Sequence, residues 1–364
     1  MGVSLRKVLS VLTLFTVAPR SLCVLRLSAI GDVCHVVALV QAVQRQWPQT
    51  QITWVMGKTE ASLLGDLPHI ECVIFDKKQG WKAYWSVWQT LRGRHFDALL
   101  HVQAALRASL LSVGIRAKYR LGFDHIRAND AQGLFTNIKV PSPSAPHVVD
   151  GLMAFAQVLG VQDLTPRWDV PLAVADQQWA AQRLAGKPTL ILVPASSKAY
   201  KNWTVAGYAA VADFASQRGL QVVLCGSPIA DEMALAAQVQ RACQFPVLNW
   251  VGQTNLKQLL ALIQQVRLVF APDSGPIHMA TLVGTPVVSL YAHHNPQRVG
   301  PYLAREGVVS VYQSLVEAEN HKPLAELPWR TRVKDPHAMQ QVTVEQVLPV
   351  LAQALQVREV PVKC

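Results

Sequence analysis

The chain has 364 residues, of which 51% are hydrophobic and only 16% charged, so it can bury sizeable cores and is not a disordered protein. Its length indicates about two domains. The formal net charge of +11 indicates an acidic partner: nucleic acid, an anionic membrane surface or a phosphorylated ligand. The basic residues are dispersed, without a run of five or six, which favours a membrane surface or an anionic substrate over nucleic acid.

No two of the six cysteines have Cys-x-x-Cys spacing. We interpret the cysteines as core residues of a reduced, cytoplasmic protein. At the amino terminus, Arg6-Lys7 and the apolar run 8–18 resemble a secretory signal. The run is too short to span a bilayer, and no Ala-x-Ala cleavage site follows it. We therefore expect residues 1–21 to be an extension or a surface-lying anchor.

Strands and helices alternate along residues 22–165, which predicts a first doubly wound, parallel α/β domain. Apolar runs predict its strands at 22–27, 51–56, 72–75 and 97–102. A Pro-Ser-Pro-Ser-Ala-Pro break at 141–146 and a weakly periodic stretch rich in Pro and Gln follow, and we place a linker at 166–188.

The pattern restarts at residue 189 and predicts a second doubly wound domain over 189–330. Its strands are predicted at 189–193, 221–225, 247–251, 266–270 and 287–291. A C-terminal segment with a final amphipathic helix is expected at 331–364. Ligands of open parallel sheets bind beyond the carboxyl ends of the strands, so two such domains facing each other predict a central cleft.

Residues 270–280 are the segment around which the rest of the chain is organised. A buried strand is followed by the turn Asp273-Ser274-Gly275, and Pro276 suits the first turn of the helix that begins there. Free backbone N–H groups and the helix dipole favour a phosphate at such a point, and His278 adds a ring nitrogen one turn further on. An ordinary strand-to-helix turn with a capping residue explains the same pattern, so both readings stay open.

Loops with chemical character follow the strands of both predicted domains. They are 28–32, 103–107, 122–127, 196–201, 226–232 and 273–278. Their convergence at strand ends carries more weight than any single motif.

Six short motifs, in this order, resemble the lipopolysaccharide heptosyltransferases, the family-nine glycosyltransferases. They are Leu25-Arg-Leu-Ser-Ala-Ile-Gly-Asp-Val33 with His35, His101-Val-Gln-Ala-Ala-Leu-Arg-Ala-Ser109, Arg120-Leu-Gly-Phe-Asp124, Lys201-Asn-Trp203, Asp273-Ser-Gly-Pro-Ile-His278 and a segment from Pro328 to Met339. The last is similar to the heptosyltransferase I type. Together the motifs extend from about residue 22 to residue 358, nearly the whole chain.

The resemblance implies the GT-B architecture, an α/β fold of two Rossmann-like domains. It also implies inverting transfer of heptose from an ADP-heptose donor, without a metal or other cofactor. The acceptor would be the acidic inner core of lipopolysaccharide, Kdo-lipid A or a heptosylated core, at the cytoplasmic face of the inner membrane. No nucleic acid is expected as a partner. A sugar-nucleotide epimerase of the same shape, or a non-catalytic nucleotide-sugar-binding protein, are the alternatives.

On this resemblance, Asp32 would be the general base, although a carboxylate that only stabilises a helix N-terminus would look the same. Lys201 would bind the donor diphosphate. The other predicted donor contacts are Ser196, Lys198, Asp273, Ser274, Gly275 and His278, with Asp231 or Glu232 at the ribose. Solvated loop lysines and a capped helix histidine are the structural alternatives.

Gln103, Arg107, Arg120 and Arg127 are the predicted acceptor contacts, with ordinary surface arginines as the alternative. The chain departs from the family pattern at two places. Ala230 stands where relatives often carry Glu, so the ribose contact would shift to Glu232 or be lost. Ala128-Asn129-Asp130 lacks an arginine that the family often has, so the acceptor could differ from the usual Kdo-lipid A.

Aromatic and basic residues alternate in the segment from Trp81 to Trp88. Such residues collect at membrane interfaces. A helix stripe that faces the core explains them equally, and we favour that interpretation.

Overall fold

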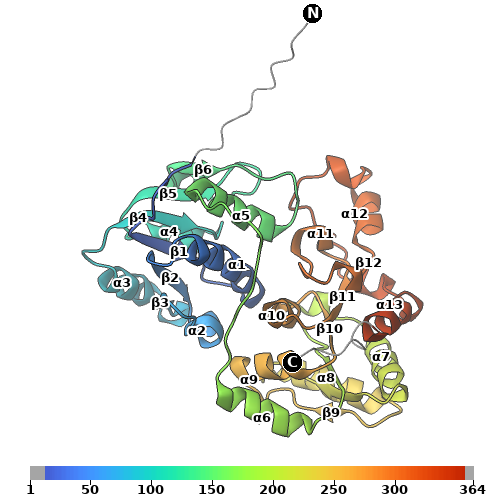
Figure 1. Ribbon diagram of the computed structural model, residues 1–364. Helices are drawn as coiled ribbons and strands as arrows, with labels where there is room; N and C mark the ends of the chain where they lie inside the picture. Colours follow the sequence, from blue (N-terminus) through green and yellow to red (C-terminus); the bar gives the residue numbers. More distant parts are fainter. Residues whose placement is uncertain (1–12, 357–364) are drawn as a thin grey trace, which may run out of the picture.

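The computed structural model describes residues 13–356, which form two α/β domains (Figure 1). The predicted extension, residues 1–21, lies largely outside the described part of the chain. The first domain contains a six-stranded sheet whose paired strands are all parallel, in the order β3-β2-β1-β4-β5-β6. Its strands are β1 (Ser21–Leu25), β2 (Gln51–Gly57), β3 (Ile70–Phe75), β4 (Phe96–His101), β5 (Ala117–Phe123) and β6 (Ile138–Val140).

Helices cover both faces of this first sheet, because its central strands are apolar on both sides. In β1, Leu22 and Val24 pack into one apolar cluster, whereas Cys23 and Leu25 pack into another. The first cluster contains α1 (Ile30–Gln46), α2 (Lys58–Leu64) and α5 (Val148–Leu159), and the second contains α3 (Trp81–Thr90) and α4 (Leu106–Ser112).

The second domain repeats the plan with a sheet of order β12-β11-β10-β7-β8-β9. Its strands are β7 (Thr189–Leu192), β8 (Gln221–Leu224), β9 (Leu248–Asn249), β10 (Leu268–Pro272), β11 (Val287–Tyr291) and β12 (Val308–Ser310). Its helices are α6 (Val174–Leu184), α7 (Val205–Gln217), α8 (Ala230–Ala242), α9 (Leu256–Gln265), α10 (Gly275–Val283), α11 (Pro296–Val299), α12 (Tyr312–Asn320) and α13 (Val344–Gln356). Short 3₁₀ turns occur at Lys77–Gln79, Gln132–Phe135, Ala199–Lys201, Arg305–Gly307, Leu324–Glu326 and Ala338–Gln341.

In each sheet the chain begins at a central strand, builds outward to one edge, and then returns to build the other half. The strand order therefore reverses between β1 and β4, and again between β7 and β10. Crevices at such reversal points are where open α/β sheets bind ligands. The predicted pair of doubly wound domains is confirmed, and the predicted linker 166–188 contains a helix, α6, that packs on α9.

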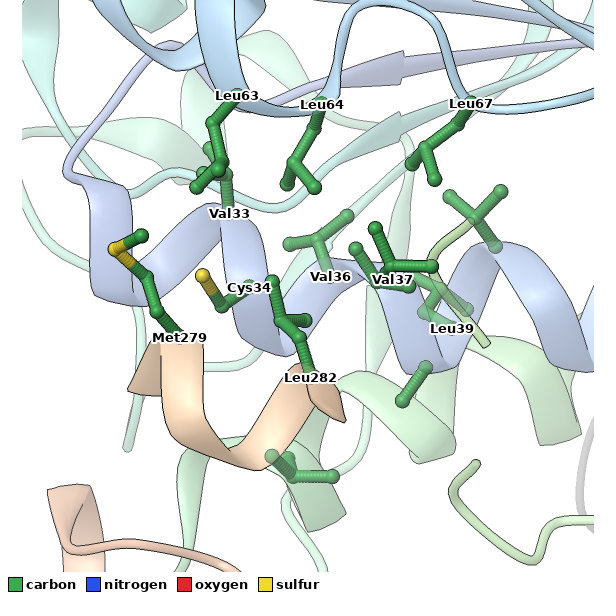
Figure 2. Packing of buried hydrophobic residues seen from close by; sticks show 14 of the residues in the cluster. Val33, Cys34, Val36, Val37, Leu39, Leu63, Leu64, Leu67, Met279 and Leu282 are labelled. Atoms are coloured by element: carbon green, nitrogen blue, oxygen red, sulfur yellow. The ribbon is translucent and has the colours of Figure 1, made fainter. Parts of the chain in front are cut away.

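The two domains meet along α1 and α10, where their apolar residues form one continuous cluster (Figure 2). Cys34 of α1 lies beside Met279 and Leu282 of α10, and Val33 lies beside Leu63 of α2. The helices approach closely because residue 31 is a glycine: a Cβ atom there would lie 2.4 Å from Cδ2 of His278. This contact brings the amino-terminal turns of α1 and α10, one from each domain, to opposite sides of one cleft.

The aromatic helix α3 differs from our prediction. Ala83 and Val87 face the core, but the side chains of Trp81 and Trp85 are 71% and 63% exposed. The interpretation of this segment as a core-facing aromatic stripe is therefore wrong for these two tryptophans. Within residues 13–356, no helix combines the length and the apolarity needed to cross a bilayer.

Candidate active site

A cleft of about 570 Å³ lies where the carboxyl ends of both sheets face each other. The first domain contributes the loops after β1, β4 and β5, and the second contributes the loops after β7, β10 and β11. The cleft therefore occupies both points of strand-order reversal, where the fold predicts ligands to bind.

Asp32 lies in the first turn of α1 and lines the cleft. Its Oδ2 atom accepts a hydrogen bond from the Ala29 amide at 3.1 Å and pairs with Nη2 of Arg26 at 2.5 Å. Arg26 is itself held by the carbonyls of Ser28 and Val102. Both contacts of the carboxylate thus use one oxygen, and its orientation is set by groups from β1 and β4.

Gln103 follows β4 and also lines the cleft. Its Oε1 accepts the Leu27 amide at 2.7 Å, and its Nε2 lies 3.5 Å from Oγ of Ser28. Gln103 therefore supports the loop that precedes Asp32.

The amino terminus of α10 faces the cleft with two buried polar atoms that have no partner. They are Oγ of Ser274, at the N-cap, and Nδ1 of His278, one turn later. Gly275 adds a backbone amide without a side chain, and all three residues line the cleft. Buried polar atoms in native proteins are normally hydrogen-bonded, so unpaired atoms at a helix N-terminus favour an anionic ligand there.

Three histidine rings contact one another where the two domains meet, His35 and His147 from the first domain and His278 from the second. The rings of His35 and His278 have centroids 4.5 Å apart, and those of His35 and His147 are 5.4 Å apart. Burial lowers the pKa of each, and it lowers that of His147 to about 4. His278 is therefore a neutral imidazole at pH 7, able to donate or accept one hydrogen bond from its free nitrogen.

Asp273 holds two neighbouring loops together. Its Oδ2 accepts hydrogen bonds from Nζ of Lys201 and from Nδ1 of His294, each at 2.7 Å. Burial would raise the pKa of Asp273, but the bond from His294 and the charge of Lys201 outweigh it and hold the pKa well below its usual value. The ion pair keeps the Lys201 ammonium group at the cleft wall.

In the loop after β7, the residues that line the cleft differ from the ones we predicted. The Ser196 hydroxyl donates to the Lys198 carbonyl at 2.9 Å and accepts from the Lys198 amide, so it stabilises its own loop. Lys198 is exposed and does not line the cleft, whereas Ser197 does. The structure thus favours Ser197 and Lys201 over Ser196 and Lys198 as ligand contacts.

Neither predicted ribose contact is among the residues that line the cleft. Glu232 lies in the first turn of α8, and its Oε2 accepts the Ser227 amide at 2.8 Å. Asp231 is exposed. The choice between them stays a prediction.

Of the predicted acceptor arginines, Arg127 lines the cleft and the other two do not. Arg107 is exposed on α4. Arg120 donates to the carbonyls of Ser112, Ile115 and Phe135, so its guanidinium ties loops together inside the first domain. The structure therefore gives Arg120 a role in the fold, and its contact with the acceptor stays a prediction. A Rossmann-like domain needs donors for loop carbonyls, and the sequence motif does not distinguish that role from ligand binding.

A family model fits residues 84–329, and its description is glycosyltransferase family 9 (heptosyltransferase). The chain belongs to this family. It is also 47% identical over 336 residues to the lipopolysaccharide core heptosyltransferase OpsX of Haemophilus influenzae, covering 92% of this chain and 97% of that one. Lipopolysaccharide heptosyltransferase 3 of Escherichia coli K12 is 26% identical over 72% of this chain and 79% of its own.

Solved structures of family 9 share the two-domain GT-B fold of this glycosyltransferase. The Escherichia coli ADP-heptose lipopolysaccharide heptosyltransferase II superposes with a TM-score of 0.70 at 20% identity, covering 94% of this chain and all of that one. A family 9 protein from Veillonella parvula gives 0.74 at 19% identity, with 93% and 97% covered.

Four residues that line the cleft of this family 9 enzyme escaped the sequence reasoning: His294, Arg298, Trp329 and Arg330. His294 and Arg298 follow the carboxyl end of β11, so the rule that ligands bind at strand ends could have found them. Trp329 and Arg330 lie in an irregular segment after α12, and only the folded chain brings them to the cleft. In the part of the chain from 13 to 356, no three His, Cys, Asp or Glu side chains are grouped as around a metal ion.

Proposed function

We propose that this family 9 glycosyltransferase transfers heptose from ADP-heptose to the inner core of lipopolysaccharide, with inversion at the anomeric carbon. The supporting observation is the pairing of two features across one cleft. A carboxylate, Asp32, lies on the first-domain side, and the α10 N-terminus with its unpaired Ser274 and His278 atoms lies on the other.

The α10 side suits the leaving diphosphate. Its backbone amides, the Ser274 hydroxyl and the His278 ring can donate to phosphate oxygens, and Lys201 adds a positive charge close by. Asp273 holds Lys201 in position through an ion pair of 2.7 Å. These groups stabilise the negative charge that ADP gains when the sugar bond breaks.

The Asp32 side suits the acceptor. Because Arg26 and the Ala29 amide both contact Oδ2, the Oδ1 atom is left for the acceptor hydroxyl. Asp32 takes the hydroxyl proton while the oxygen bonds to the anomeric carbon, and ADP departs from the opposite face. One base and one leaving-group site on opposite walls account for inversion.

The test is ADP release from purified protein given ADP-heptose, with and without Kdo-lipid A. Release should depend on the acceptor, and Asp32→Asn should slow it by about 100-fold or more, the usual loss for a general base. Asp66→Asn, an exposed carboxylate outside the cleft, is the matched control. Tight donor binding without release from wild type would instead indicate a binding protein, and an isomerised sugar without acceptor would indicate an epimerase.

The transfer is proposed to need no metal. The Lys201 ammonium group and the positive end of the α10 dipole supply the positive charge that a metal would otherwise provide at the diphosphate, and the neutral His278 ring adds a hydrogen-bond donor. Acceptor-dependent ADP release should therefore be the same with and without EDTA. A loss in EDTA that Mg²⁺ restores would overturn this part of the proposal.

The enzyme is further proposed to work in the cytoplasm, attached peripherally to the inner face of the inner membrane, with α3 as the contact. The exposed Trp81 and Trp85 lie in a segment, 77–94, that has five basic residues and no acidic one. Because α3 follows the carboxyl end of β3, this surface begins at the sheet edge that also borders the cleft. Tryptophan beside lysine and arginine suits an anionic bilayer surface.

Vesicle sedimentation tests this contact. Wild type should bind phosphatidylglycerol vesicles more tightly than phosphatidylcholine vesicles, and the Trp81→Ser/Trp85→Ser variant should bind at least about tenfold more weakly. Val174→Ser, which removes an exposed apolar residue from α6, is the control. Equal binding by all three proteins would exclude α3 as the contact.

A further inference from the structure

Three arginines surround the indole ring of Trp329 at one wall of the cleft. The guanidinium carbon lies 4.7 Å from the ring centroid for Arg127, 4.8 Å for Arg298 and 5.8 Å for Arg330. Arg127 follows β5 in the first domain, and Arg298 belongs to α11 in the second. We call these three residues the arginine cluster.

The residues that line the cleft include more basic than acidic side chains, and the arginine cluster accounts for the difference. The lysine and arginine residues are Arg26, Lys201 and the cluster, whereas the carboxylates are Asp32 and Asp273. Both carboxylates already form ion pairs, Asp32 with Arg26 and Asp273 with Lys201. None of the ion pairs between described residues includes a member of the cluster.

Arg127 and Arg298 are partly removed from water without an anionic partner, whereas Arg330 is exposed. Arg127 is only 3% exposed, and its two Nη atoms donate to the carbonyls of His147 and Ala145. The Nε atoms of Arg127 and Arg298 are buried without a hydrogen-bond partner. Burial, and then the nearby charge of Arg330, lower the pKa of Arg298. A guanidinium withdrawn from water is costly unless it is paired, so this wall of the cleft favours an anion.

The protein's own carboxylates near the cluster are engaged elsewhere. Asp150 accepts the Tyr302 hydroxyl at 2.9 Å, Asp124 accepts the Ser142 amide and hydroxyl, and Asp130 accepts the Leu106 amide. Against the effect of burial, Asp150 and Asp124 still raise the pKa of Arg127, and Asp130 raises that of Arg330, but none of them forms an ion pair with the cluster. The cluster can therefore take a directly bound anion from a ligand.

The position of the cluster favours the acceptor as the source of that anion. The Trp329 indole donates to the Pro146 carbonyl at 2.8 Å, and Arg330 donates to the Arg127 carbonyl, so this C-terminal segment crosses onto the first domain. The function proposed above already places the donor phosphates at a separate site, the α10 N-terminus. The arginine cluster therefore lies against the first domain, which is also the domain that carries Asp32.

Resting on the function proposed above, we propose that Arg127, Arg298 and Arg330 together bind an anionic group, a phosphate or a carboxylate, of the acceptor. Acceptor recognition is then shared between the domains, since α11 and the Trp329 segment belong to the second. Planar guanidinium groups bind such anions in bidentate fashion, which fixes the orientation of the acceptor toward Asp32.

Steady-state kinetics with Kdo-lipid A test the assignment. Arg298→Gln and Arg330→Gln should each raise the KM for the acceptor roughly 10- to 100-fold, the value of a charge-assisted hydrogen bond, and leave the KM for ADP-heptose unchanged. Arg332→Gln, an exposed arginine two residues further on, should behave as wild type. A raised KM for ADP-heptose with an unchanged acceptor KM would overturn the proposal and assign the cluster to the donor.

Modified acceptors identify the anion. Wild type should lose the same 10- to 100-fold when the Kdo carboxylate is methylated, if the carboxylate is bound, or when the acceptor phosphates are removed by phosphatase. Arg298→Gln should no longer discriminate between the charged and the neutralised acceptor. Loss on neither treatment would overturn the proposal.

A binding measurement separates this inference from the proposed function. Calorimetric titration of inorganic phosphate, with ADP saturating so that the donor seat is filled, should detect a site that Arg298→Gln weakens and Arg332→Gln does not. If wild type binds phosphate in this way but never releases ADP from ADP-heptose, the function fails and the anion site stands. If turnover occurs but the phosphate site is absent, the anion site fails alone.

Discussion

At the scale of single residues, the cleft depends on two carboxylates that are each held by a basic partner. The Asp273–Lys201 pair is largely buried, with side-chain exposures of 13% and 15%, so water screens it little. The Glu71–Arg94 pair on the surface has a similar geometry at 2.5 Å, but its side chains are 45% and 40% exposed. The two pairs should therefore differ in what their loss costs.

We expect Asp273→Asn to lower the free energy of unfolding by about 2–4 kcal/mol, because Lys201 would lose its partner in a poorly solvated position. Glu71→Gln should cost at most about 1 kcal/mol. Urea unfolding at pH 7 measures both. Equal effects would show that burial does not govern the Asp273 pair, and a double variant with Lys201→Met should recover part of the loss.

At the scale of elements, α1 and α10 decide how the domains face each other. Their first turns carry Asp32 and the Ser274–His278 groups, so a shift of one helix against the other changes the distance between the proposed base and the proposed site of the leaving group. Gly31 permits the approach, since any side chain there meets the His278 ring. The glycine is needed for space, because its φ is not in the left-handed region.

Gly31→Ala should therefore reduce activity more than it reduces stability. Overpacking at a helix contact costs about 1–3 kcal/mol, and a displacement of about 1 Å between reacting groups can cost 100-fold in rate. Urea unfolding and acceptor-dependent ADP release give the two values. Gly133→Ala, whose added Cβ would meet only the Lys139 ammonium at 3.8 Å, should leave both unchanged. Wild-type activity in Gly31→Ala would contradict the close-approach argument.

At the scale of the whole molecule, buried neutral histidines limit stability in acid. Burial lowers the pKa of His35, His101, His147 and His278, to about 4 for His101 and His147. The unfolded chain binds these protons near pH 6.5, before the folded protein does. Stability is therefore complete above about pH 6.5 and is lost as pH falls below it.

The free energy of unfolding should fall with decreasing pH below about 6.5, with a slope that approaches four protons, or about 5 kcal/mol per pH unit. Urea unfolding between pH 5 and 8 measures it. His101→Asn should reduce the limiting slope by about 1.4 kcal/mol per pH unit, as one titrating group is removed. A pH-independent stability over this range would contradict the prediction, because it would mean that the folded protein and the unfolded chain bind protons equally at each pH.

Much of the architecture could be predicted before the structure was known. Strand runs such as 189–193 and 287–291 are almost entirely apolar, as is typical of buried parallel strands, and the turns that end them are made of small and polar residues. The loops that reach the cleft with Asp32, Gln103, Lys201 and Asp273 follow from the rule that strand carboxyl ends share one edge. These features depend on short segments of the chain, so they can be predicted from the sequence.

Other features depend on contacts between distant parts of the chain, and there the predictions were incomplete. Arg120 and Arg127 lie seven positions apart and looked alike as acceptor residues. Both donate to loop carbonyls, and only the packing decides that Arg127 also lines the cleft whereas Arg120 does not. The exposure of Trp81 and Trp85 likewise depends on which side of α3 meets the sheet.

The sequence by itself determined two doubly wound domains, the strand-turn-helix junction at the start of α10 and a basic composition, because hydrophobic period, turn chemistry and charge are properties of short segments. Only the tertiary structure decided that α1 and α10 oppose Asp32 to His278, and that Trp329 brings three unpaired arginines from both domains together. The reason is physical: desolvation and charge compensation arise from groups more than a hundred residues apart, and they exist only after the chain has folded.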